Sequence, residues 1–275
     1  MATSPSPVDL LGYLLTCSFP SSLLPYLRHA AKHKYLMEKH NSRLWSSCRG
    51  NSSLCLLPQH LHQVCPLFPL RLAKTVRLRL GEAAPLLRDL AGLKVVLLVR
   101  DPRGVYNSRQ SVPWCRSPQC TEPFLGCTDL LADLAAAEEL GTRHPGSVAV
   151  LRYEDLARGG EVVARRLLDF LALPWRREVG RFLETHTVSE PPRMVRSRGG
   201  KLVARRDNYS TRRNSLAAAV AWRGQLSWER VGEVQQGCGQ VMARLGYRRL
   251  GTEEQMLGEE EVVGGVDSRL RNIMI

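Results

Sequence analysis

Residues 93–109, LKVVLLVRDPRGVYNSR, predict a strand that leads through a tight turn into a helix. The apolar run 95–99 is short and rich in β-branched residues, which is typical of a strand buried on both faces. Arg100 follows at the carboxyl end of this strand. Asp101 is a suitable helix N-cap, and Pro102 suits the first helical position, where no backbone donor is needed. The sequence therefore predicts a helix that begins at Pro102.

The position of Arg100 indicates an anion site. Open α/β sheets bind their ligands at the carboxyl ends of the strands. A guanidinium there, beside a helix N-terminus, is suited to a phosphate or a sulfate. In the alternative interpretation Arg100 pairs with Asp101, and Ser108 faces solvent.

The pattern R-D-P-R-x-x-x-x-S, which spans residues 100–108, resembles the 3′-phosphate-binding motif of sulfotransferases. It most closely resembles that of the Golgi carbohydrate 6-O-sulfotransferases, which act on galactose, N-acetylglucosamine and N-acetylgalactosamine. The resemblance implies a P-loop-like α/β fold with a central, mainly parallel sheet flanked by helices. It also implies that Arg100 and Ser108 hold the 3′-phosphate of the sulfate donor, 3′-phosphoadenosine 5′-phosphosulfate (PAPS). The intervening Asp101, Pro102 and Arg103 belong to the same donor-binding motif.

A second strand-to-helix turn follows later in the chain. The apolar run 147–151, SVAVL, leads into R-Y-E-D-L at 152–156, which resembles a second signature of the same sulfotransferases. The resemblance implies that Tyr153 joins the donor site from a neighbouring strand. In the alternative interpretation, Glu154 and Asp155 merely start a helix and interact favourably with its dipole.

A third segment, TRRNSLAAAVAWR at 211–223, resembles the family's late R-[DN]-S-x₆-W-[RK] pattern. The resemblance implies that it closes over the donor nucleotide and that Arg213 and Ser215 bind the donor. Trp222 and Arg223 also match the pattern. A Trp on an Ala-rich helix that simply faces the core is the alternative for Trp222.

The family's R-x-G-S-S/T-F/W loop, which grips the 5′-phosphosulfate, has no match in these residues. We therefore expect a sulfotransferase fold without its first strand and phosphosulfate loop, in a chain that is incomplete at its N-terminus and whose full-length form carries a membrane anchor. No residue is assigned as the catalytic base. The available groups are His29, His33, His186, Glu122 and Glu154.

Composition limits the classes of partner. The 275 residues include 39 basic and 26 acidic side chains, a net charge of +13, which favours anionic partners such as nucleotides and acidic glycans. Aromatic residues make up only 6% of the chain, and no interleaved basic–aromatic surface is evident, so nucleic acid is not an expected partner. No stretch approaches the ~18 apolar residues of a membrane span, and no signal peptide is visible.

Eight cysteines in a chain of this size favour disulfides in an oxidising lumen. The family resemblance implies that this lumen is that of the Golgi. We expect at least two disulfides. A zinc site near Cys48, Cys55 and Cys65 is the alternative, although no C-x-x-C pair exists. Asn51 and Asn208 lie in N-glycosylation sequons.

The remaining chain is assigned by periodicity. We expect a sulfotransferase domain over residues 10–247 and a disordered acidic tail over 251–275. Within the domain, the sequence predicts helices over 21–31, 128–140, 161–171, 178–186 and 227–245, a strand over 70–80, and a basic loop over 189–206 that is either a solvated linker or a clamp. His29 and His33 lie at i, i+4 on the first helix, where a basic solvated face and a metal site are the two interpretations.

Three functions follow. The first is a PAPS-dependent carbohydrate 6-O-sulfotransferase that needs no metal and acts on a glycan, with acidic glycans among the candidates. The second is a non-catalytic relative that binds nucleotide or glycan. The third, a nucleic-acid-binding protein, is disfavoured by the low aromatic content.

Overall fold

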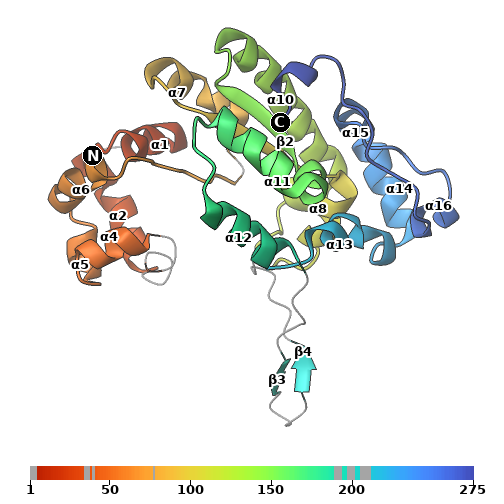
Figure 1. Ribbon diagram of the computed structural model, residues 1–275, viewed down its shortest axis with the longest axis horizontal. Helices are drawn as coiled ribbons and strands as arrows, with labels where there is room; N and C mark the ends of the chain where they lie inside the picture. The colour runs from red at the N-terminus through yellow and green to blue at the C-terminus, as the bar shows by residue number, and fades with distance from the viewer. Residues whose placement is uncertain are drawn as a thin grey trace. The chain divides into compact units, whose positions relative to one another are not determined.

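The computed structural model describes residues 5–33, 38, 41–76, 78–188, 194–196, 202–204 and 212–275 (Figure 1). The chain divides into two compact units, Met1–Asp89 and Leu90–Ile275. The expected domain over residues 10–247 spans parts of both units and stays a prediction, and the residues beyond 247 belong to the second unit.

The first unit is helical. Its core contains the buried residues Cys17, Phe19, Leu23, Leu27 and Leu61. The helices are α1 (Pro7–Leu15), α2 (Leu24–Ala31), α4 (Ser42–Ser47), α5 (Ser52–Cys55), α6 (Pro58–Val64) and α7 (Ala84–Asp89), with 3₁₀ turns η1 (Ser21–Leu23), η2 (Cys65–Leu67) and η3 (Leu80–Ala83).

The predicted strand over residues 70–80 is wrong. The described residues from Leu70 to Val76 are irregular and exposed, and Leu72 is 90% exposed. Alternation of apolar and basic residues makes a strand only where a neighbouring strand accepts its hydrogen bonds, and this segment has no strand partner among the described residues. Lys74 lies in this exposed segment, and Arg77 lies outside the described residues.

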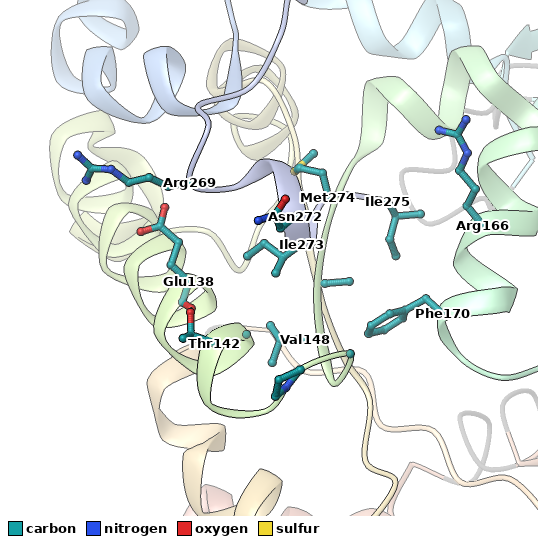
Figure 2. Close-up of a pocket in the computed structure, with 14 residues that line it drawn as sticks. Glu138, Thr142, Val148, Arg166, Phe170, Arg269, Asn272, Ile273, Met274 and Ile275 are labelled. Carbon is teal, nitrogen blue, oxygen red and sulfur yellow. The ribbon is translucent and has the colours of Figure 1, made fainter.

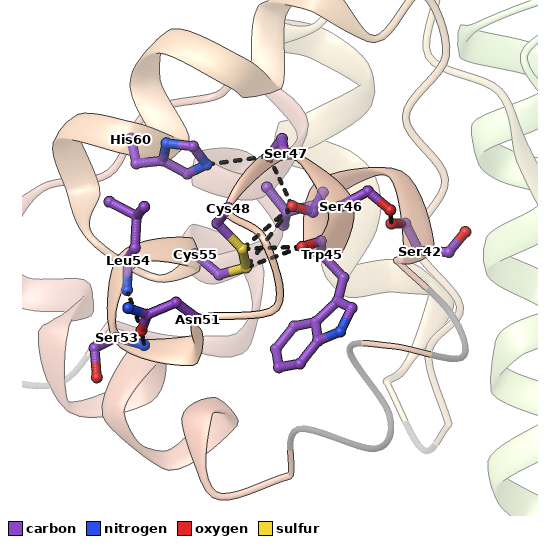
Figure 3. Close-up of a disulfide and its surroundings, with 11 residues drawn as sticks. Ser42, Trp45, Ser46, Ser47, Cys48, Asn51, Ser53, Leu54, Cys55 and His60 are labelled. Atoms are coloured by element: carbon purple, nitrogen blue, oxygen red, sulfur yellow. Dashed lines mark hydrogen bonds between the residues drawn. A yellow bond between two sulfur atoms is a disulfide. The ribbon is translucent and has the colours of Figure 1, made fainter.

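All eight cysteines form disulfides, which confirms the expectation of at least two. The pairs are Cys17–Cys65, Cys48–Cys55, Cys115–Cys120 and Cys127–Cys238. The zinc interpretation is wrong because its three cysteines are oxidised. The Cys48–Cys55 disulfide closes a short loop that contains Asn51 (Figure 3). The Oδ1 of Asn51 accepts from the backbone amides of Ser53 (3.0 Å) and Leu54 (3.3 Å) and so caps the N-terminus of α5.

We expect the protein, denatured without reductant, to show no titratable thiol. The reason is that each cysteine is bonded to another cysteine of the same chain. Titration with a thiol reagent, before and after reduction, checks this. Detection of two or more thiols before reduction would contradict at least one of the four pairs.

The second unit is built on two parallel strands. β1 (Val95–Val99) pairs with β2 (Val148–Arg152) in a register that places Val95 opposite Val148 and Val99 opposite Arg152. Both strands lie close to where the sequence predicts them. Every residue of β2 is buried, whereas Leu98 of β1 is 61% exposed, so β1 is not buried on both faces as expected.

Helices follow each strand directly. α8 (Pro102–Arg109) leaves β1 at the predicted Asp101 cap, where the carboxylate accepts from the Arg103 amide (2.9 Å). α11 (Tyr153–Phe170) leaves β2 without a loop, earlier than the predicted residue 161, with a break at Gly160, whose φ is +44°. α10 (Pro123–Arg143) and α11 both pack against β2 (Figure 1).

The other elements are α9 (Pro118–Thr121), α12 (Arg177–Thr187), α13 (Ser215–Val220), η4 (Ala221–Gly224), α14 (Trp228–Gly237) and α15 (Gly239–Leu245). The predicted helix over 227–245 is thus two helices, capped by Ser227 and ended by left-handed Gly246. β3 (Met194–Arg196) and β4 (Leu202–Ala204) form an antiparallel pair. Most of the predicted basic loop, and Asn208, lie outside the described residues.

The expected disorder over residues 251–275 is wrong. The segment contains α16 (Glu253–Leu257) and η5 (Arg271–Ile273), and Met274 forms a parallel bridge with Val150 of β2. Its acidic, glycine-containing composition suggests a tail, but a few apolar side chains dock it in the core: Met256 is 2% exposed and Leu270 is fully buried. Tertiary burial overrides the compositional signal here.

Candidate functional site

Arg100 and Ser108 lie together at the carboxyl end of β1. The Arg100 Nη1 donates to Ser108 Oγ at 3.1 Å, and Ser108 Oγ donates to the Gly104 carbonyl at 3.0 Å. Ser108 is reached two helical turns after Arg100 because α8 starts directly at the strand end. The predicted convergence of these two side chains is confirmed, and their binding of a phosphate stays a prediction.

The Arg100 guanidinium is held from three sides. Its Nη2 donates to the Ala218 carbonyl of α13, and its Cζ lies 4.9 Å from the centroid of the Tyr153 ring. A Cβ on Gly104 would lie 3.0 Å from Arg100 Nε, so glycine leaves room for the guanidinium over α8. Arg100 Nε is buried and has no hydrogen-bond partner within the described part of the chain.

A buried, unpaired cationic donor is costly unless a ligand satisfies it. Of the alternative interpretation from the sequence, the pairing of Arg100 with Asp101 is wrong, since the Asp101 carboxylate binds Arg103 instead, whereas Ser108 is exposed as that interpretation expects. The charge of Arg100 therefore remains available to an anion. This observation fits the 3′-phosphate that the motif implies.

Tyr153 and Ser215 bring two more segments to the same place. The Tyr153 hydroxyl donates to the Ser215 carbonyl at 3.2 Å. Ser215 is the first residue of α13, whose N-cap Asn214 accepts from the Ala217 amide at 2.9 Å. Arg213 is exposed, and its backbone amide donates to the His186 carbonyl at 3.2 Å. Donor binding by Tyr153, Arg213 and Ser215 stays a prediction.

Asp101 and Arg103 form a buried ion pair beneath this surface. The side chain of Arg103 is fully buried and that of Asp101 is 1% exposed, and Arg103 Nη2 lies 2.7 Å from Asp101 Oδ2. Arg103 also donates to Gln235 Oε1 at 3.3 Å, and its Cζ lies 4.2 Å from the Trp222 ring centroid. Like Pro102, these side chains are enclosed by protein. The structure favours support of the strand end, rather than direct donor contact, for all three.

Trp222 faces the core, as in the alternative interpretation from the sequence, and is fully buried. Arg223, which also matches the late motif, donates to the carbonyls of Gln255 (3.2 Å), Met256 (3.0 Å) and Gly258 (2.5 Å). Arg223 therefore holds the C-terminal segment against the unit.

The Glu154 carboxylate is buried between Asp101 and Tyr247 and is not accessible as a base. It is 3% exposed, its Oε1 accepts from the Asp101 amide at 3.0 Å, and its Oε2 accepts from the Tyr247 hydroxyl at 2.7 Å. Burial raises the pKa of Glu154, while the two hydrogen bonds act in the opposite direction. Burial, and then the neighbouring Glu154 charge, raise the pKa of Tyr247.

We expect Glu154→Gln to gain stability relative to the wild type as the pH rises. A carboxyl group whose pKa is higher in the folded state stabilises the fold below its unfolded pKa, ordinarily 4.5, and that contribution is lost as the pH rises through the folded-state pKa. Urea unfolding of both proteins at about pH 4 and about pH 7 measures the difference. An equal difference at both values would show that Glu154 does not titrate abnormally.

The histidines considered as a base contact their own neighbours. His186 ends α12, where its Nδ1 lies 2.8 Å from Thr185 Oγ1 and its ring stacks on Phe182. His29 and His33 belong to the first unit and contact each other edge to face. Across the described ranges, no cluster of three or more His, Cys, Asp or Glu could hold a metal ion.

A cavity of about 740 Å³ lies at the opposite end of β2 (Figure 2). Val148, the first residue of the strand, lines it together with Phe170, Arg269 and the C-terminal residues. Because Arg100 and Tyr153 lie at the carboxyl ends of the strands, this cavity is separate from the candidate site.

Sequence reasoning missed Ala218, Gln235 and Tyr247. The Ala218 contact uses only a backbone carbonyl, so no residue type announces it. Gln235 lies 132 residues along the sequence from its partner Arg103. Tyr247 lies 93 residues along the sequence from its partner Glu154. Nothing in the local pattern around either residue marks it as part of this network.

Comparison with known proteins gives a consistent result. The family described as "Sulfotransferase domain" matches residues 89–246. Carbohydrate sulfotransferase 1 of Mus musculus is 30% identical over 237 residues, which cover 75% of this chain and 55% of the relative. The Homo sapiens protein of that name is 31% identical over 201 residues, 66% of this chain and 46% of the relative. Carbohydrate sulfotransferase 2 of Homo sapiens is 29% identical over 214 residues, which cover 63% of this chain and 38% of the relative.

The chain thus spans about half the length of the curated relatives that it matches first. No solved structure matches it significantly. No helix within the described ranges is both long enough and apolar enough to cross a membrane.

Proposed function

The chain belongs to the sulfotransferase family, and on this premise we propose that it takes part in sulfuryl transfer from PAPS to the 6-hydroxyl of a galactose, N-acetylglucosamine or N-acetylgalactosamine residue in a glycan. The relatives that it resembles are carbohydrate sulfotransferases, which supports a sugar acceptor. The disulfides support an oxidising compartment, and we propose the Golgi lumen.

The observation that carries this proposal is the shared position of Arg100 Nη1 and Ser108 Oγ, 3.1 Å apart at the strand end. A guanidinium and a hydroxyl together supply charge-assisted and neutral donors to a tetrahedral anion. The buried Arg100 Nε without a partner in the described chain supports a ligand at this place. Tyr153 and Ser215 line the same strand end from neighbouring segments.

Sulfuryl transfer resembles phosphoryl transfer, in which positioning and charge stabilisation do most of the work. Arg100 and Ser108 would hold the donor by its 3′-phosphate, and the cationic charge of Arg100 supports binding without a metal. Removal of the acceptor's proton needs a base. Because Glu154 is buried and hydrogen-bonded, it does not supply one.

The unavailability of Glu154 as a base favours a second candidate, a non-catalytic relative that binds nucleotide or glycan. Two measurements separate the candidates. The first is calorimetric binding of 3′,5′-ADP, and the second is transfer of labelled sulfate from PAPS to acceptors that end in N-acetylglucosamine or galactose. Binding with transfer supports the enzyme, and binding without transfer supports the non-catalytic relative. Absence of 3′,5′-ADP binding refutes the enzyme and the nucleotide-binding form of the non-catalytic relative.

A further inference from the structure

A buried chain of hydrogen bonds links Tyr247 to the strand end that carries Arg100. The Tyr247 hydroxyl donates to Glu154 Oε2 at 2.7 Å, and Glu154 Oε1 accepts from the backbone amide of Asp101 at 3.0 Å. Tyr247 and Glu154 are each 3% exposed, and Asp101 is 1% exposed. Water therefore does not reach these groups to replace a missing partner.

The Asp101 amide belongs to the peptide that joins Arg100 to Asp101. Its hydrogen bond to Glu154 fixes the plane of that peptide at the point where β1 becomes α8. The direction in which the Arg100 side chain leaves the backbone depends on this plane. A shift of about 1 Å at a binding group is enough to weaken its function strongly.

Tyr247 is itself firmly placed. It follows Gly246, whose φ of +74° ends α15, and its amide donates to the Met242 carbonyl at 2.7 Å. The next residue, Arg248, donates from its amide to the Val262 carbonyl at 2.8 Å. The hydroxyl thus reaches Glu154 from a fixed backbone.

We propose that Tyr247 is a positioning residue, which acts through Glu154 to hold the Arg100–Asp101 peptide so that the Arg100 guanidinium meets the 3′-phosphate of the donor. Tyr247 lies one residue beyond the 89–246 range that the family matches. This inference rests on the proposed function, because it assumes that a 3′-phosphate binds at Arg100.

The test compares Tyr247→Phe with Tyr106→Phe. Tyr106 is a matched control because it is also 3% exposed and its hydroxyl donates to a carbonyl, that of Glu122, at 3.1 Å. Each variant loses the hydrogen bonding of one hydroxyl on a buried tyrosine, but only Tyr247→Phe breaks the chain to Asp101.

The readout is the ratio of affinities for 3′,5′-ADP and 5′-AMP, measured by calorimetry. The two nucleotides differ only in the 3′-phosphate, so general loosening of the fold lowers both affinities and leaves the ratio unchanged. We expect Tyr247→Phe to lower the ratio about fivefold, the equivalent of one buried hydrogen bond. We expect Tyr106→Phe to keep it close to that of the wild type.

Hydrogen exchange of the Asp101 amide gives a second readout that needs no ligand. We expect faster exchange in Tyr247→Phe than in Tyr106→Phe. A wild-type protein with no preference for 3′,5′-ADP over 5′-AMP would refute the proposed function. A wild-type preference that survives unchanged in Tyr247→Phe, or an Asp101 amide that exchanges equally in both variants, would refute the positioning role alone.

Discussion

Replacement of Arg100 by alanine is expected to lower the affinity for 3′,5′-ADP by about 100-fold. Hydrogen bonds from a charged group contribute about 1.5–3 kcal/mol each, and about 1.4 kcal/mol corresponds to a factor of ten. Arg100 presents its Nη1 beside Ser108 and keeps a buried Nε without a partner in the described chain, so its loss removes the charge and at least one donor. Calorimetric titration with 3′,5′-ADP measures the effect.

The matched control is Arg109→Ala, on the same helix. The Arg109 guanidinium donates to the carbonyls of Gln119 and Cys120, away from Ser108. We expect this variant to bind 3′,5′-ADP with nearly wild-type affinity. If Arg100→Ala binds as well as Arg109→Ala does, the assignment of the 3′-phosphate site is wrong. Thermal unfolding of both variants shows whether each is folded, since Arg100 also donates to the Ala218 carbonyl.

Replacement of Arg103 by methionine is expected to lower the free energy of unfolding by about 3–5 kcal/mol, because it leaves the buried Asp101 carboxylate without its counter-charge. Arg103 is fully buried and binds both carboxylate oxygens of Asp101. Urea unfolding with the disulfides intact measures the change. An effect of this size is a large part of the total stability of an ordinary domain.

Arg143→Met is the control for this substitution. Arg143 pairs with Glu139 one helical turn away at 2.8 Å, and the two side chains are 67% and 58% exposed. Exposed pairs of this kind contribute about 0–1 kcal/mol. If the two variants lose similar free energies of unfolding, burial of the Asp101–Arg103 pair does not increase its contribution to stability, and the prediction is wrong.

The second unit was largely predictable where the signal is local. A short apolar run followed by Asp-Pro predicted β1 and α8, and the motif spacing predicted that Arg100 and Ser108 meet. These features depend on residues within two helical turns of each other. The apolar run 147–151 likewise predicted β2 within one residue.

The errors came from contacts that are distant in sequence. Periodicity over residues 70–80 gave no information on whether a neighbouring strand exists, and composition over 251–275 gave none on whether Leu270 finds a core. The motif also assigned Arg103 to the donor, although the structure encloses its charge between Asp101 and Gln235. Arg103 turns inward partly because Gln235 and Trp222, more than a hundred residues later in the chain, receive it, and local sequence cannot show this.

The wide separation of these partners bears on how the protein is made. Asp101 and Arg103 leave the ribosome long before Gln235 and Tyr247, and Cys127 long before Cys238. During synthesis the nascent chain must carry the Asp101–Arg103 pair and a free Cys127 thiol without their final partners, a period in which chaperones and disulfide isomerases act. A messenger that stops before codon 247 would encode the whole nucleotide motif but not Tyr247, whose hydroxyl binds Glu154 in its interior.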